Sequence, residues 1–331
     1  MLDGRRSEIL RSLVECHVRS GTAVSSRMVL DHSELAVSPA TVRKELAHLE
    51  EEGFAVQPHT SAGRIPTALA YRFYVDNHAA FRLRRAVQSR ISEFFSEVQL
   101  ELGRLLHATS RLVSDITRLP TVVVGPRLAA ERIQSFHLVS LQLRLAMMVV
   151  VTESARVLQE LCHLPAPMSR REISNMEQVV RSHAVGSPLG VPAPPALAAP
   201  DGSQNPFGGC LREVWDALER VALRASDVYV MGTGRLADLW DDLDAVAQVL
   251  TVLERETTML ELLATDPGTT IRIGEEIPDL AEADLAVVST SFLAGSSRGR
   301  IGVLGPMRMN YGRAISVVER VSEELAGRIG S

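Results

Sequence analysis

Residues 38–75 read SPATVRKELAHLEEEGFAVQPHTSAGRIPTALAYRFYV, and their pattern changes from helical to extended at Gly53. Ser38 can cap a helix that starts at Pro39, and Gly53 can take the left-handed backbone conformation that ends it. Apolar residues recur at helical spacing and would bury one stripe of this helix: Val42, Leu46 and Leu49. The first part of the segment is therefore predicted to be an amphipathic helix.

The opposite face of this predicted helix carries short and basic side chains: Ala40, Thr41, Arg43, Lys44, Ala47 and His48. Short side chains allow a helix to approach the major groove of DNA, and Arg or Lys can reach guanine or phosphate. We expect Thr41, Lys44 and His48 to lie at base edges or adjacent phosphates. Arg43 is expected at a phosphate or a base. Lys44 is also the only lysine of the chain.

Two short extended runs follow the helix, Phe54–Gln57 and Arg64–Pro66. A small loop with hydroxyl side chains joins them, which predicts a hairpin. A hairpin of this kind can lay Thr60, Ser61 and Arg64 against the phosphate backbone or into the minor groove. The residues expected to bind DNA are therefore Ser38, Thr41, Arg43, Lys44, His48, Thr60, Ser61 and Arg64.

The residues before this segment supply two more helices. Arg5–Arg19 is predicted to be an amphipathic helix that ends at Gly21, and Ser25 or Ser26 can cap a short second helix. Three helices followed by a hairpin are the plan of a winged helix-turn-helix DNA-binding domain. The alternative interpretation is a packing unit with solvated charges, because helix-turn-helix patterns taken alone give many false matches.

The rest of the chain alternates between helical and extended patterns. Residues 81–119 are predicted to form a helical connector, and residues 184–210, rich in Pro, Gly and Ala, a mobile loop. Extended runs are predicted at 121–126, 133–141, 144–151, 227–232, 270–274, 285–291 and 299–306, and helical runs at 152–181, 211–224, 243–264 and 311–329. Strands on both sides of a mostly helical block indicate one α+β domain with an insertion at about 160–224.

The run QPHTSAGRIPT at 57–67, together with YRFYV at 71–75, closely resembles the winged-helix segment of HrcA, the bacterial heat-inducible transcription repressor family. Further matches are Ser38–Arg43, Glu45–Leu46, Leu49–Gly53, Ile271–Glu276 and Gly302–Tyr311. The chain departs from the family pattern at Ala70, Ile277 and Asn310, and residues 165–225 match poorly. The resemblance therefore covers nearly the whole chain, with specific motifs at both ends.

This resemblance implies an α+β fold class: an N-terminal winged helix-turn-helix, then a GAF-like domain that a mostly helical dimerising insertion interrupts. The implied domains are 1–80 for DNA binding, 81–119 for the connector, 120–159 with 225–331 for the GAF-like domain, and 160–224 for the insertion, with its mobile loop at 184–210. The sequence does not identify the surface that makes the dimer.

The resemblance also implies a function. The expected protein is a homodimeric repressor of the CIRCE inverted repeat, a double-stranded DNA operator upstream of the chaperone operons for GroES-GroEL and GrpE-DnaK-DnaJ. The chaperonin GroEL is expected to keep this repressor active until heat diverts GroEL to unfolded proteins. The alternative is a winged-helix transcriptional regulator that senses a small molecule through its GAF-like domain.

Composition indicates a cytoplasmic protein without a cofactor. The chain has 331 residues and a net charge of −5, yet residues 1–85 hold 12 Arg and Lys against 10 Asp and Glu. Its three cysteines lack metal-ligand spacing, and the sequence shows neither a signal peptide nor an apolar run of the roughly 20 residues that a membrane span needs. No catalytic or phosphate-loop motif is present, so we expect neither an enzyme nor a membrane protein.

Overall fold

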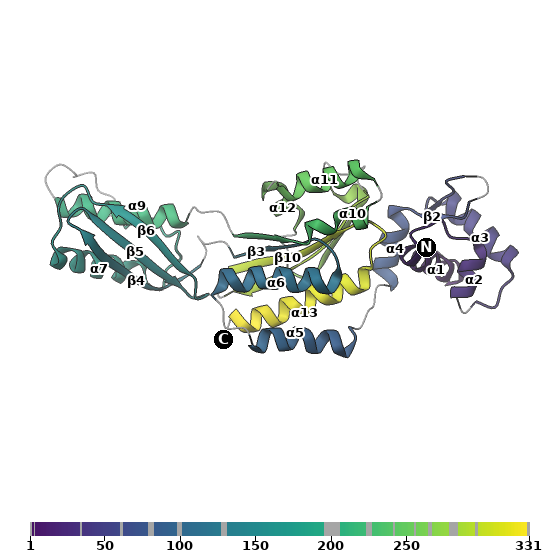
Figure 1. Cartoon of the computed structure of the whole chain (residues 1–331), viewed down its shortest axis with the longest axis horizontal. Helices are drawn as coiled ribbons and strands as arrows, with labels where there is room; N and C mark the ends of the chain where they lie inside the picture. Colours follow the sequence, from purple (N-terminus) through teal and green to yellow (C-terminus); the bar gives the residue numbers. More distant parts are fainter. Residues whose placement is uncertain are drawn as a thin grey trace.

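The computed structural model describes residues 2, 4–33, 35–59, 62–78, 83–97, 101–126, 131–194, 206–222, 227–240, 242–254, 256–263, 267–277, 284–294 and 297–329. Within them the chain is a mixed α/β protein whose three bodies lie in a row (Figure 1). The N-terminal body lies at one end, a three-layer body lies in the centre, and a smaller body of strands and helices lies at the other end.

The N-terminal body consists of four helices and a short hairpin. Its elements are α1 (Gly4–Ser20), α2 (Ser26–His32), α3 (Pro39–Glu51), β1 (Ala55–Val56), β2 (Ile65–Pro66) and α4 (Ala68–His78). Ser25 caps α2, because its side chain accepts a hydrogen bond from the Met28 N–H, as its position predicts. Fully buried residues form the core between the helices: Leu10, Leu13, Val14, Val29 and Leu49.

The central body is a five-stranded antiparallel sheet between two helical layers (Figure 1). Its strands are β3 (Thr121–Val124), β7 (Val228–Met231), β8 (Thr270–Ile273), β9 (Ala286–Ala294) and β10 (Ser297–Gly305), in the order β7-β3-β10-β9-β8. One face packs on α6 (Leu102–Thr117) and α13 (Tyr311–Ile329), and the other on α10 (Leu236–Leu239), α11 (Leu243–Glu254) and α12 (Glu256–Leu262). The predicted C-terminal strands and the predicted final helix are confirmed.

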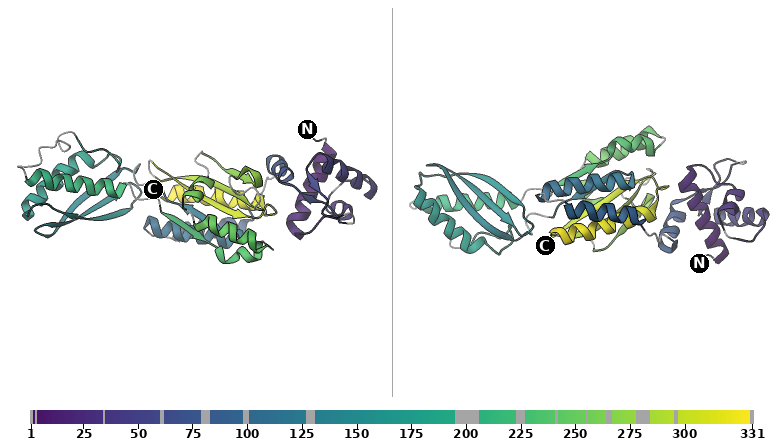
Figure 2. Two further views of the ribbon diagram at one scale, coloured as in Figure 1. Left: turned by 90° about the horizontal axis from the view of Figure 1, so that it is seen from above. Right: turned by 60° about the horizontal axis from the view of Figure 1, so that its bottom comes forward.

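The third body interrupts the central one and has its own antiparallel sheet. Its strands are β4 (Ile133–Gln142), β5 (Leu145–Thr152) and β6 (Val157–His163), in that order, and its helices are α7 (Arg170–Ala184) and α9 (Pro206–Ala222). Both helices pack on the same face of the sheet, where Phe136, Met148, Val180 and Trp215 are buried. Figure 2 shows this body, which we call the β4–β6 body, next to the central one, on the side away from the N-terminal body. We call the junction of the two bodies, where Arg156 approaches Glu131 and Asp227, the neck.

The β4–β6 body differs from the prediction in two ways. The sequence pattern placed residues 133–151 with the C-terminal strands in one domain, whereas the structure pairs them with each other and with β6. The helical run predicted at 152–181 was also wrong in its first part, because β6 lies within it. Its inward-facing residues, Leu158 and Cys162, are buried and those beside them are not, and the neighbouring strand pairs with this run.

The loop predicted at 184–210 is shorter in the structure. Residues 195–205 lie outside the described residues. On the near side, Leu189 is fully buried and its N–H donates to the Glu131 carbonyl at 2.8 Å. On the far side, α9 already begins at Pro206, which suits the first turn of a helix.

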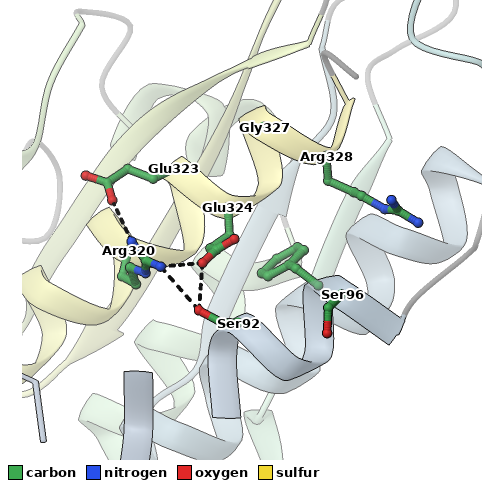
Figure 3. A pocket seen from close by; sticks show the side chains of 8 residues that line it. Ser92, Ser96, Arg320, Glu323, Glu324, Gly327 and Arg328 are labelled. Atoms are coloured by element: carbon green, nitrogen blue, oxygen red, sulfur yellow. Dashed lines mark hydrogen bonds and ion pairs between the residues drawn. The ribbon is translucent and has the colours of Figure 1, made fainter. Parts of the chain in front are cut away.

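The predicted connector at 81–119 forms two separate helices. α5 (Arg85–Glu97) packs on α13, and α6 belongs to the helical layer of the central sheet. A polar cluster holds α5 in place (Figure 3): Ser92 Oγ donates to Glu324 Oε1 at 2.8 Å, and Arg320 Nη2 donates to Ser92 Oγ at 3.2 Å. The buried residues Ile91 and Phe95 add the apolar contact. Of these two helices, α6 belongs to a layer of the central body and α5 lies outside it.

Helix α4 joins the N-terminal body to the central one. The buried rings of Tyr71 and Tyr311 lie 5.9 Å apart, and burial raises the pKa of both hydroxyls far above their ordinary value. Next to them, the Arg72 guanidinium donates to both oxygens of Glu276 and, at 2.7 Å, to the Ile271 carbonyl on the edge strand β8. This contact covers the sheet edge and fixes α4 against it.

The Arg72–Glu276 pair gives a pH-dependent prediction. Partial burial alone would raise the pKa of Glu276, but hydrogen bonds from Arg72 and the Ile273 N–H hold this pKa below its ordinary value of 4.5. The pair therefore stabilises the fold above pH 4.5, and the stabilisation is lost as the pH falls through the lowered pKa. Because Glu276 is 41% exposed, its contribution should stay below about 1 kcal/mol.

We expect Glu276→Gln to lower the free energy of unfolding at pH 7 and to have a smaller effect at pH 4. Urea unfolding at both pH values measures this difference. Asp216→Asn, which removes an exposed carboxylate of α9, serves as the control. A loss of equal size at both pH values would contradict the electrostatic explanation.

Candidate nucleic-acid interface

Helix α3 begins and ends where the sequence predicts. The Ser38 side chain accepts a hydrogen bond from the Thr41 N–H at 3.1 Å, and its Oγ lies 2.9 Å from Thr41 Oγ1. After the helix, Gly53 has a φ of 82°, and the Phe54 N–H donates a hydrogen bond to the Leu49 carbonyl at 2.8 Å. Both ends of the helix are therefore fixed by local hydrogen bonds.

The predicted stripe of α3 is buried, and the opposite face is open. Val42, Leu46 and Leu49 lie in the core, whereas Arg43 and Lys44 are exposed. Among the described residues, no hydrogen bond or ion pair engages either of these two side chains. An unpaired cation can neutralise a phosphate or bind a base without first breaking a contact within the protein.

The other residues predicted to contact DNA on α3 and the hairpin differ in their partners and in whether the structure describes them. His48 Nδ1 lies 3.2 Å from Glu51 Oε2 on the same helix, and this side chain still reaches the solvent. Thr60 and Ser61 lie outside the described residues. Ser38 is exposed, and its oxygen is occupied by the helix cap.

The hairpin is anchored to the start of α2 by backbone pairing. Arg64 and Val24 exchange two hydrogen bonds, at 2.8 and 2.9 Å, and the Gln57 side-chain amide donates to the Ala62 carbonyl across the loop. Arg64 Nη2 also lies 2.9 Å from Glu50 Oε2 on α3. Arg64 therefore ties the hairpin to α3 as well as presenting a guanidinium beside it.

A hollow lies between the start of α2, the exposed side of α3 and the hairpin. Its volume is about 520 Å³, and it is lined by Val24, Ser25, Ser26, Arg43, Leu46, Gln57, Ala62, Gly63 and Arg64. Two guanidinium groups, hydroxyl groups and an amide are the donors that suit phosphate oxygens. Ser25, Ser26 and Gln57 were not among the residues predicted to contact DNA. The signal in the sequence was a pair of hydroxyl side chains at the start of α2 and a polar residue beside the hairpin loop.

Gly63 is required by the close approach of the hairpin to α2. A Cβ at this position would lie 2.3 Å from the Val24 carbonyl oxygen and 2.9 Å from the Ser25 nitrogen. We expect Gly63→Ala to cost about 1–3 kcal/mol of stability, because the hairpin has to move away from α2. The same movement opens the hollow and should weaken DNA binding.

Thermal unfolding and fluorescence anisotropy with a labelled duplex measure the two effects of Gly63→Ala. Gly327→Ala is the matched control, because a Cβ at this exposed helical position meets nothing within 4 Å. Full stability and unchanged DNA affinity in Gly63→Ala would show that the hairpin does not depend on this contact.

Other kinds of site find no support in the described part of the chain. No group of three or more His, Cys, Asp or Glu there could hold a metal ion, and no described helix is long and apolar enough to cross a membrane. All three cysteines are buried, and burial raises the pKa of each thiol. The exposed face of α3 and the adjacent hollow are therefore the candidate site.

Comparison with known proteins gives a consistent answer over the whole length. The family model for the HrcA protein C terminal domain matches residues 103–315. A protein of Frankia casuarinae named "Heat-inducible transcription repressor HrcA" is 34% identical over 100% of both chains. A protein of Symbiobacterium thermophilum with the same name is 32% identical over 98% of each chain.

One solved structure has a similar fold. The crystal structure of a hypothetical protein at 2.2 Å resolution superposes with a TM-score of 0.68 and covers 100% of this chain and 99% of that chain. Its sequence identity is 22%, so the similarity concerns the fold alone.

Proposed function

The chain belongs to the HrcA family of heat-inducible transcription repressors, and from this we propose that it represses transcription by binding an inverted-repeat operator as a homodimer. One observation carries the proposal to particular residues. Arg43 and Lys44 are exposed and, among the described residues, unpaired on a helix whose other side is buried. The comparisons do not favour the alternative of a small-molecule sensor.

We infer that the N-terminal body is a winged helix-turn-helix. In this interpretation α3 enters the major groove with Thr41, Lys44 and His48 near base edges, while the hairpin lies against the adjacent backbone. Two contacts support this: the backbone pairing between Val24 and Arg64 holds the hairpin at the start of α2, and the ion pair between Arg64 and Glu50 ties it to α3. The hollow next to Arg43 would then receive a phosphate of the DNA backbone beside that groove.

The dimer surface that we propose is the outer face of the β4–β6 sheet. Across the three strands, Met147 is paired with Val139 on one side and with Leu161 on the other. Val139 and Leu161 are more than 40% exposed, and Leu141 and Val157 on the same sheet are similarly exposed. The helices α7 and α9 cover only the opposite face. A continuous apolar face of this kind usually marks a protein interface.

A second copy of this chain is the occupant that suits both ends of the molecule. The β4–β6 body and α3 lie at opposite ends of the described chain (Figure 1). Two copies joined through equivalent faces carry two α3 helices related by one two-fold axis. An inverted-repeat operator has the same symmetry, so each α3 can bind one half-site.

Five further features remain proposals that rest on the family resemblance: the operator, the controlled operons, the role of GroEL, the GAF-like domain and the dimerising insertion. The operator is CIRCE, the controlled operons encode GroES-GroEL and GrpE-DnaK-DnaJ, and GroEL maintains the active repressor. The central body is the GAF-like domain, in which we now place residues 101–126 and 227–329. The dimerising insertion then spans residues 131–222, in place of 160–224, because β4 and β5 pair within it.

Fluorescence anisotropy of a labelled CIRCE duplex, beside a scrambled duplex at the same salt concentration, tests the proposed function. Tight binding to CIRCE alone, strengthened by GroEL, is the expected result. Equal and weak binding to both duplexes, with and without GroEL, would contradict both the operator and the role of the chaperonin.

A further inference from the structure

A buried charge cluster joins the β4–β6 body to the central body. Arg156, in the turn between β5 and β6, is 4% exposed, and Glu131, just before β4, is 2% exposed. Arg156 Nε lies 3.9 Å from Glu131 Oε1, and Arg156 Nη2 lies 3.5 Å from Oδ2 of Asp227. Because Asp227 immediately precedes β7, one guanidinium contacts carboxylates from both bodies.

The central sheet leaves space for this guanidinium. Gly125 follows β3, and its N–H donates to the Asp227 carbonyl at 2.8 Å. A Cβ at Gly125 would lie 2.8 Å from Arg156 Nη2, so a larger residue would displace the guanidinium. In chain order, β3 is the last strand of the central body before β4, and β7 is the first strand of the central body after α9.

The cluster is poorly satisfied for one so deeply buried. No hydrogen bond engages Arg156 Nε, Nη1 or Nη2, or Glu131 Oε1, among the described residues. Only Glu131 Oε2 is bonded, by the Ser154 hydroxyl, which also lies 2.9 Å from Thr152 Oγ1. Buried ion pairs of this quality are often no more stable than apolar residues of the same size, so stability alone does not account for the cluster.

We propose that Arg156 is a positioning residue that fixes the direction of the β4–β6 body relative to the central body. A charged contact to a carboxylate on each side restricts the angle at the neck, whereas an apolar contact tolerates sliding. One consequence rests on the proposed function. If the dimer forms at one end and α3 binds DNA at the other, the angle at the neck sets the separation of the two α3 helices.

Distances between two spin labels on one chain measure the angle directly and without DNA. Asn175→Cys on α7 and Gln248→Cys on α11 provide exposed label sites, and the native cysteines are buried. Labelled protein is diluted with unlabelled protein so that only distances within one chain contribute. The unmodified neck should give one narrow distribution, and Arg156→Met with Glu131→Gln should broaden it at least about twofold.

The double variant removes both buried charges, so it avoids the uncompensated charge that a single change would leave. Its unfolding temperature should be unchanged or higher. If it nevertheless fails to fold, Asp227→Asn removes the contact to the central body at a 45% exposed carboxylate and should broaden the distances in the same direction. Arg220→Met, which breaks exposed pairs with Glu160 and Glu213, is the control and should leave the distribution narrow.

An unchanged distribution in folded variants would overturn the positioning role, whatever the DNA result. A broadened distribution supports it, and a duplex with two half-sites should then lose about tenfold in affinity while a single half-site is bound as before. A broadened distribution with no binding to either duplex retains the positioning role and contradicts the proposed DNA function instead.

Discussion

Replacing Arg43 and Lys44 together by alanine is expected to lower the affinity for the operator by about 100-fold or more. Each side chain is exposed and, among the described residues, unpaired, so the variant loses contacts to DNA and none within the protein. A good side-chain contact to a base discriminates by about 1–3 kcal/mol, so two such losses amount to about 2–6 kcal/mol together, and about 2.8 kcal/mol already corresponds to 100-fold. The helix cap at Ser38 and the buried stripe remain, so stability should not change.

Anisotropy with operator and scrambled duplexes, repeated at several salt concentrations, separates the two roles of these residues. Loss at the operator alone assigns them to bases, and an equal loss on both duplexes with a smaller salt dependence assigns them to phosphates. Arg85→Ala with Arg90→Ala is the control, since it removes the same charge from exposed positions on α5. Equal losses in the control pair would mean that net charge, and not the position on α3, determines binding.

Leu161→Glu is expected to convert a dimer into monomers. The side chain is 48% exposed on the outer face of the β4–β6 sheet, so a carboxylate there costs the free chain little. In a dimer that uses this face the carboxylate is buried without a partner, twice per dimer, which is strongly unfavourable. Binding to a two-half-site operator should fall by about 100-fold or more, because the linkage between half-sites is lost.

Light scattering after gel filtration gives the mass of the Leu161→Glu variant at a fixed concentration. A single half-site should still be bound normally, because α3 is at the far end of the molecule (Figure 1). Asn175→Glu, an exposed position on α7 on the covered side of the sheet, is the control. A dimer of unchanged affinity in Leu161→Glu would place the interface elsewhere.

Local signals in the sequence were sufficient for α3. The cap at Ser38, the end at Gly53 and the buried stripe depend on neighbours within a few residues, and all three are as predicted. The final helix from Tyr311 to Ile329 has the predicted limits for the same reason. The exposure of Arg43 and Lys44 also follows from helical periodicity alone.

Contacts between distant segments could not be predicted. Glu50 and Arg64 are far enough apart in sequence that no periodicity links them, yet their ion pair decides how the hairpin sits on α3. The helical run predicted at 152–181 was wrong in its first part for a related reason, because a short amphipathic strand such as Val157–His163 looks like part of a helix until its partner strand is known. The pairing of Arg156 with carboxylates of two bodies is likewise visible only in three dimensions.

Acylation of Lys44 tests the central claim, that α3 lies on the operator, most directly. Lys44 is the only lysine, and cleavage at arginine releases it at the start of a peptide covering residues 44–64, so its modification can be followed by mass. Saturating operator should protect Lys44 from an amine-reactive reagent, and a scrambled duplex should protect it much less at the same salt concentration. Acylation of Lys44 at the same rate in free protein and in a saturated operator complex would contradict the proposed interface.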